Sequence, residues 1–246
     1  MEIIPIRYYF RFGDRPDAPD AVEEVFDLQL DAKTLELQDN IPKILPDWTK
    51  LDFYQCSNCP LDVRKHPFCP LAANLVNVVN RFDSLFSYYE TNLVVTTKER
   101  MISQVTTVQR ALGSLMGLVI ATCGCPHTVF FKPMARFHLP LANNQETVYR
   151  AASMYLLAQY FMQKEGKPVD WELKGLEDIY NNIQLVNYTI AERLRAATRS
   201  DSVLNALVEL DIFAQTLSLV IEDSLEDIRF LFDSYLAKKN KKGKEK

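Results

Sequence analysis

Glycine is scarce, because the chain of 246 residues contains only seven. Glycine supplies the tight turns of phosphate-binding loops and of large β-sandwiches, so its scarcity argues against both. The sequence also lacks the motifs of nucleotide-binding loops, serine hydrolases, zinc peptidases and dinucleotide-binding domains. It has no Glu-x-x-His pair of the kind that binds iron in a di-iron bundle. No catalytic motif is therefore recognisable, which favours a non-enzymatic role.

Long hydrophobic runs are absent as well. The longest apolar stretch, residues 111–121, is shorter than the ~20 residues that cross a bilayer. The first residues, MEIIPIRYYFRFGDR, lack the basic segment and apolar core of a signal peptide. We therefore expect a cytoplasmic protein without membrane contact, in which thiols stay reduced. Five cysteines, an odd number, also fit a disulfide framework poorly.

The net charge of −4 is unevenly distributed along the chain. Residues 238–246, KKNKKGKEK, carry six lysines and one glutamate, which leaves a charge of −9 on the rest. Terminal lysine runs are usually solvated, so we expect a disordered basic tail. An acidic body without a basic face gives no electrostatic footprint for nucleic acid. Binding to an unidentified protein partner stays open.

Residues 1–40 predict a small antiparallel β unit. Apolar side chains alternate with polar ones, the period of a half-buried strand, at Ile4, Ile6, Tyr8, Phe10 and Phe12. A second alternating run occupies Val22, Phe26, Leu28 and Leu30. Leu35 and Leu37 indicate a short third strand.

Residues 41–237 predict a mainly helical body, so the expected fold class is α+β. A helix is expected to begin at Pro70, and residues 92–106 are expected to form a hairpin. A further helix is expected to end near Cys123. A capping box at residues 143–146 precedes a helix that is apolar nearly all round, which is typical of a central bundle helix. Two more apolar stripes follow, the second with an expected break near residues 222–224.

All five cysteines and all three histidines lie between residues 56 and 138. One cluster, CSNCPLDVRKHPFCP, contains Cys56, Cys59, His66 and Cys69, and a second, CGCPH, contains Cys123, Cys125 and His127. A C-x2-C pair is the commonest turn for clamping a metal, and a third cysteine follows ten residues later. Proline directly follows three of the cysteines, as it often does beside iron–sulfur clusters.

This spacing predicts a four-thiolate metal site. The ligands that it selects are Cys56, Cys59, Cys69 and Cys125. The cofactor is an iron–sulfur cluster or zinc, because the same thiolates serve both. The residues that support these ligands or replace one of them are His66, Cys123, His127, Arg136 and His138.

Several alternatives stay open at this point. In one alternative, the four ligands of a zinc ion are Cys56, Cys59, His66 and Cys69. In another, zinc binds the three cysteines of the first cluster together with Cys125 or His127. Cys125 is a nucleophile if His127 lowers its pKa. One interpretation of the following segment is an anion pocket formed by Lys132, Arg136 and His138. The other is that these three residues lie in the core or on the surface. All five cysteines are buried core residues if no metal binds.

The motifs CSNCPLDVRKHPFCPLA and GCPHTVFFKPMARFHLP, with the N-terminal RYYFRFG and FDLQLDAKTLEL, resemble those of an uncharacterised bacterial family. The resemblance covers most of the chain and implies no activity, substrate or cofactor. The sequence therefore predicts a cytoplasmic metal- or iron–sulfur-binding protein whose site joins two loops, with a structural or sensory role. The alternative is a non-enzymatic protein-interaction module with buried cysteines and no metal.

Overall fold

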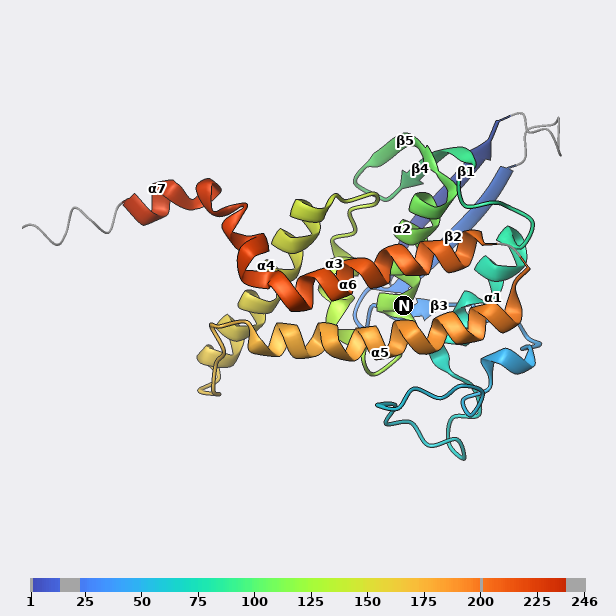
Figure 1. Cartoon of the computed structure of the whole chain (residues 1–246), viewed down its shortest axis with the longest axis horizontal. Coiled ribbons are helices and arrows are strands. Elements are labelled where there is room, and N and C mark those ends of the chain that lie inside the picture. The colour runs from blue at the N-terminus through green and yellow to red at the C-terminus, as the bar shows by residue number, and fades with distance from the viewer. Residues whose placement is uncertain (1, 14–22, 200, 238–246) are drawn as a thin grey trace, which may run out of the picture. The chain divides into compact units, whose positions relative to one another are not determined.

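The computed structural model describes residues 2–13, 23–199 and 201–237, and confirms the α+β class (Figure 1). Its elements in chain order are β1 (Ile3–Phe12), β2 (Glu23–Asp31), β3 (Leu37–Gln38), η1 (Asp47–Thr49), α1 (Pro70–Phe82), β4 (Glu90–Thr96), β5 (Met101–Thr107), α2 (Val108–Thr122), η2 (Val129–Phe131), α3 (Lys132–Arg136), α4 (Asn144–Lys164), α5 (Lys174–Ala197), α6 (Ser202–Glu226), η3 (Arg229–Phe232) and α7 (Asp233–Leu236). The expected tail at residues 238–246 and the strand residue Val22 lie outside the described residues.

One antiparallel sheet contains the five strands in the order β3-β2-β1-β4-β5. In β1 the even-numbered residues from Ile6 to Phe12 are buried and the odd-numbered ones are half-buried or exposed. The register pairs Tyr8 with Phe26 on one side and with Val95 on the other, so buried residues stand beside buried residues. The expected hairpin of residues 92–106 provides β4 and β5 and thereby joins the N-terminal strands in one sheet.

The buried face of the sheet packs on α1 and α2. An aromatic cluster lies at its centre, where the ring of Phe82 from α1 meets those of Phe10, Phe12 and Phe26 at centroid distances of 5.1–6.2 Å. The hydroxyl of Tyr8 reaches Ser114 on α2, with an oxygen–oxygen distance of 3.0 Å between the two hydroxyls. Aromatic side chains from two strands and one helix therefore fix how the helices lie on the sheet.

Both expected helix starts are present. Pro70 occupies the first turn of α1, where its missing N–H leaves no intrahelical bond unmade. The amide of Glu146 donates to the side chain of Asn143, and its carboxylate accepts from the Asn143 backbone, which completes the expected capping box of α4.

The chain divides into two compact units. The first contains residues 1–141 and 182–212, and the second contains residues 142–181 and 213–246. Helices α5 and α6 contribute residues to both units. The strands of residues 90–107 belong to the first unit and to the same sheet as β1 and β2.

Two further expectations about the helices are wrong. Only Val148, Ala151, Ala152 and Gln159 of α4 are buried, so α4 is not a central helix surrounded on all sides. Helix α6 also continues through residues 222–224 without the expected break. Nothing in the backbone interrupts it there, since serine and the acidic residues are tolerated inside a helix at a modest cost. Of the helices described, none is long and apolar enough to span a bilayer.

The aromatic cluster makes a test of the fold. We expect Phe82→Ala to lower the free energy of unfolding by about 3–5 kcal/mol, because it removes a fully buried ring and leaves a cavity. The matched control is Phe86→Ala, whose side chain is 46% exposed, and its effect should stay near ~0.5 kcal/mol. Urea unfolding of both variants measures the difference. Equal losses would contradict the position assigned to Phe82.

Candidate metal centre

The four predicted ligands converge on one small cavity in the first unit. Its lining residues are Leu51, Cys56, Cys59, Leu61, Cys69, Pro70, Leu71, Cys125, His127, Val186, Ile190 and Arg193. Four of these twelve residues are cysteines, and three separate segments of the chain contribute them. All five cysteines of the chain are free thiols, so no disulfide competes for these sulfur atoms.

A tight turn presents the first two cysteines. The amide of Cys59 donates to the carbonyl of Cys56 at 3.0 Å, which closes the C-x2-C turn. Both side chains are half-buried, as expected for a turn that aims two sulfur atoms at one place. The turn is also tied to the helical body, since the side-chain amide of Asn58 donates to the side-chain oxygen of Asn182 on α5 at 2.9 Å.

The third cysteine stands at the start of a helix. Cys69 is the N-cap residue of α1, and its amide donates to the carbonyl of Thr49 at 2.8 Å. The amide of Leu51 in turn donates to the carbonyl of Pro67 at 2.9 Å. These two bonds fasten the end of the first cysteine cluster to the segment that precedes it. Cys69 is therefore held by a rigid element, while Cys56 and Cys59 lie on a loop.

The fourth cysteine follows the end of α2. Gly124 adopts a φ of +83°, in the left-handed region, and so turns the chain sharply between Cys123 and Cys125. The carbonyl of Cys125 accepts from the amide of Thr128 at 3.1 Å, which closes a turn directly after it. The glycine of the CGCPH motif thus directs its two cysteines to different places.

His127 joins the two cysteine clusters. Its Nε2 lies 2.7 Å from the backbone carbonyl of Asn58. A carbonyl oxygen only accepts, so Nε2 carries the proton and donates. His127 therefore acts as a brace between CGCPH and CSNC.

Among the residues that the structure describes, Arg193 is the largest fully buried side chain, with 1% of its surface exposed. Its guanidinium donates to four backbone carbonyls, those of Trp48 (2.8 Å), Lys50 (2.7 Å), Leu51 (3.1 Å) and Tyr54 (3.2 Å). In the described part of the chain no carboxylate forms an ion pair with Arg193. Burial lowers the pKa of Arg193, and the thiols of Cys69, Cys56 and Cys59 oppose that shift, as does Asp52 to a smaller degree.

Burial is the largest influence on the pKa values of the Cys56 and Cys125 thiols. It raises the pKa of Cys125 to about 11 and also raises that of Cys56. Neighbouring thiols add to both shifts, since Cys69 and Cys56 act on Cys125, and Cys69 and Cys59 act on Cys56. A thiol activated as a nucleophile needs a lowered pKa, so this environment disfavours the catalytic interpretation of Cys125 and His127.

The remaining residues that the sequence singled out lie elsewhere. The sulfur of Cys123 is 3.1 Å from the carbonyl of Ile120, inside the end of α2, and burial raises its pKa to about 12. His66 is exposed, and the ring of His138 hydrogen-bonds the hydroxyl of Tyr8 beneath the sheet. Arg136 is exposed over the ring of Phe137.

Sequence reasoning missed Arg193 as part of the site. Its signal is a cation on the apolar face of a helix, three residues after Ile190 and seven after Val186. An arginine at such a position has to find acceptors inside the protein, because an unpaired buried charge is costly.

The described side chains include no group of three or more His, Cys, Asp and Glu residues that is arranged to hold a metal ion. A tetrahedral zinc ion with Zn–S bonds of about 2.3 Å would require sulfur atoms about 3.8 Å apart. The four thiols of the described structure therefore line one cavity without forming a complete ion site.

A family model described as a domain of unknown function (DUF6901) matches residues 6–233. The match includes every cysteine and histidine of the chain, together with Arg193. No curated protein and no solved structure matches the chain. The site therefore has to be interpreted from its own residues.

The clamp made by Arg193 leads to a stability prediction. We expect Arg193→Met to lower the free energy of unfolding by about 3 kcal/mol, because it leaves buried carbonyls without a donor. The control is Arg195→Met two residues away, where an exposed arginine pairs with Glu192 and loss should cost less than ~0.5 kcal/mol. Urea unfolding of the metal-free protein measures both. A loss no larger for Arg193→Met than for its neighbour would contradict the clamp.

Proposed function

For this chain, which belongs to the uncharacterised DUF6901 family, we propose a role as an iron–sulfur-binding protein. The proposed ligands are the thiolates of Cys56, Cys59, Cys69 and Cys125. The observation that carries the proposal is that these four cysteines, from three separate segments, line a single cavity. Four of five cysteines would gather there only by coincidence if they served solely as small core residues.

The charge of the cavity supports a bound anion. No described carboxylate forms an ion pair with the buried guanidinium of Arg193, and Asp52 opposes its pKa shift only weakly. Four thiolates around a cation of charge +2 carry a net charge of −2, and Arg193 lines the same cavity. A negatively charged metal–thiolate centre would therefore balance the charge of Arg193.

The residues that follow the thiols favour a cluster over a zinc ion. Proline directly follows Cys59, Cys69 and Cys125, as it often does beside iron–sulfur clusters. A zinc ion uses the same four thiolates, so the metal content of the protein decides between the two.

The proposed role of the centre is structural or sensory, in the cytoplasm, where thiols stay reduced. Its ligands are up to 69 positions apart in the sequence, so a bound cluster would contribute directly to folding free energy. Two of the four are half-buried, which leaves the loop side of the site accessible to oxidants. Loss of the cluster would release the loop that precedes α1, and this change is what a sensor would report.

Cysteine substitutions test the ligand set. Protein purified without oxygen should contain iron and acid-labile sulfide, with broad visible absorption, and both Cys59→Ser and Cys125→Ser should lose them. Cys123→Ser is the matched control, because Cys123 is equally buried, lies two residues from Cys125 and points to Ile120. It should retain the wild-type iron content.

The outcomes separate the proposal from its alternatives. Stoichiometric colourless zinc that depends on the same four cysteines would replace the cluster with a zinc site. Wild-type protein with no stoichiometric metal would favour an interaction module whose buried thiols are neutral. The raised pKa of Cys125 agrees with this alternative, because it favours the neutral thiol. Unchanged iron in both ligand variants would contradict the proposed ligands.

The brace made by His127 gives a second test. We expect His127→Ala to bind the cluster but to lose it faster in air, because the turn of Cys56 and Cys59 is no longer held to CGCPH. His66→Ala, which alters an exposed histidine of the first cluster, should decay at the wild-type rate. The decay of visible absorption after exposure to oxygen measures the rates. Equal decay of both variants would remove His127 from the site.

A further inference from the structure

Among the described residues of the second unit (142–181 and 213–246), more large apolar side chains are exposed than are fully buried. Those that are buried are Val148, Leu173, Leu176, Tyr180, Ile221 and Ile228. Eleven are exposed, namely Tyr149, Leu156, Leu157, Tyr160, Phe161, Trp171, Phe230, Leu231, Phe232, Tyr235 and Leu236. Because the exposed set outnumbers the buried set, this unit buries too little apolar surface by itself and presents an interaction surface.

Five of the exposed residues form one face of α4. This α4 stripe comprises Tyr149, Leu156, Leu157, Tyr160 and Phe161, whose spacings of three, four and seven place them on the same side of the helix. The opposite side carries the buried Val148, Ala152 and Gln159. The helix is thus apolar on two faces, and only one of them has a partner within the unit.

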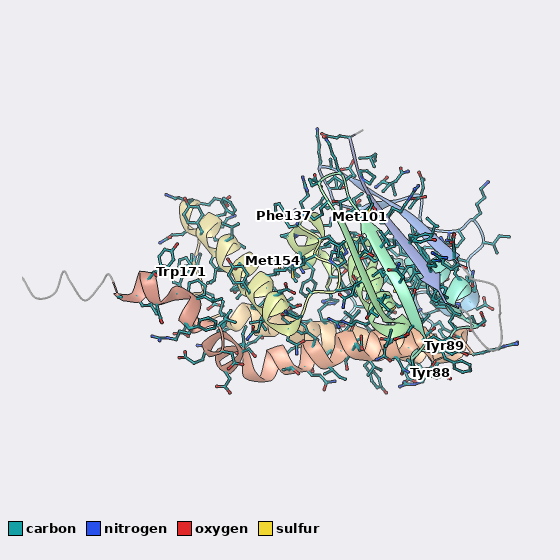
Figure 2. All side chains as sticks on the ribbon, turned by 90° about the horizontal axis from the view of Figure 1, so that it is seen from above. Tyr88, Tyr89, Met101, Phe137, Met154 and Trp171 are labelled. Atoms are coloured by element: carbon teal, nitrogen blue, oxygen red, sulfur yellow. The ribbon has the colours of Figure 1, made fainter. Side chains whose placement is uncertain are left out.

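The other exposed group lies at the end of the described chain. The C-terminal arm comprises η3 and α7, residues 229–236, and Figure 1 shows it continuing past the end of α6. Phe230, Leu231 and Tyr235 are 64%, 58% and 77% exposed, so these side chains of the arm are not packed on the rest of the second unit. Figure 2 places Met154 and Trp171 in the same unit, on α4 and on the turn that follows it.

The second unit is acidic, whereas the sequence after the arm is basic. Residues 142–181 and 213–237 carry eleven acidic and five basic side chains, a net charge of −6. The arm leads directly into the six lysines of residues 238–246. The sequence that follows the arm is therefore complementary in charge to the unit that bears the stripe.

We propose that two copies of the chain pair by exchange, with the C-terminal arm of each lying across the α4 stripe of the other. Exchange covers two unpartnered apolar surfaces in each copy at once, and it closes with two-fold symmetry, the commonest arrangement of homodimers. The positive charge of residues 238–246 and the negative charge of the second unit favour this pairing. This pairing is independent of the metal centre, all of whose residues lie in the first unit.

Three double variants test the two surfaces. Leu157→Ser with Phe161→Ser removes apolar contacts of the stripe, and Leu231→Ser with Tyr235→Ser removes those of the arm. Met101→Ser with Val105→Ser is the control, since these β5 residues are 69% and 64% exposed but belong to the first unit. Light scattering during gel filtration should show a dimer for the wild type and the control. The stripe variant and the arm variant should each raise the dimer dissociation constant about tenfold or more.

Mixing experiments test the exchange itself. Neither the stripe variant nor the arm variant can form an intact arm–stripe contact with its own kind. A mixture can form one, between the arm of the stripe variant and the stripe of the arm variant. We therefore expect a heterodimer of intermediate affinity in the mixture, detected by crosslinking of two differently tagged copies. Absence of that heterodimer, with each variant folded by circular dichroism, would overturn the exchange.

Three other outcomes would also overturn the proposal. The first is a wild-type protein that stays monomeric at its highest soluble concentration. The second is a dimer that survives both double variants. The third is a monomer that binds vesicles of phosphatidylserine and phosphatidylcholine through the arm alone, which would assign the arm to an anionic lipid surface. Replacement of the six terminal lysines by glutamine should weaken the dimer, and an unchanged dissociation constant would remove the charge contribution.

Discussion

The candidate site depends on one buried guanidinium. Arg193 provides donors for four carbonyls between residues 48 and 54, a segment with little secondary structure of its own. Without Arg193 each of the four carbonyls would lose a donor, although that of Lys50 also accepts from the amide of Phe53. The C-x2-C turn begins two residues after this segment, so its position is set by the same bonds. A helix of the body therefore places a loop that could not place itself.

The thiols and Arg193 impose opposite electrostatic demands on the same cavity. Burial and mutual proximity disfavour thiolates, as the raised pKa values of Cys56 and Cys125 show. Arg193 favours them, because it lacks another nearby anion of comparable effect. A cation among the four sulfur atoms would satisfy both demands, since it stabilises the thiolates and leaves a net negative charge for the guanidinium. Neutral thiols would satisfy only the first.

The sequence predicts the elements whose causes are local. The alternation of Ile6, Tyr8 and Phe10, Pro70 at a helix start and the capping box at Asn143 are each decided by neighbouring residues, and the structure confirms them. The convergence of Cys125 on the first cluster could be expected from spacing alone, but the roles of Arg193 and Asn58 could not. Their partners are 139–145 and 124 positions away, and no short pattern records such contacts. The prediction that α4 is a central bundle helix is wrong for a different reason. Composition shows that a helix has two apolar faces, but it does not show whether other parts of the protein cover both.

The clamp also sets an order of events during synthesis. Cys56, Cys59 and Cys69 leave the ribosome more than a hundred residues before Arg193, and α2 with Cys125 also precedes it. Chains grow from the N-terminus at about 5–20 residues per second, so all four thiols are exposed for several seconds before the cavity can form. A metal delivered during that interval would meet an open loop, whereas one delivered later would meet a loop already fastened to α5. The position of a single arginine in the chain thus decides when the site first exists.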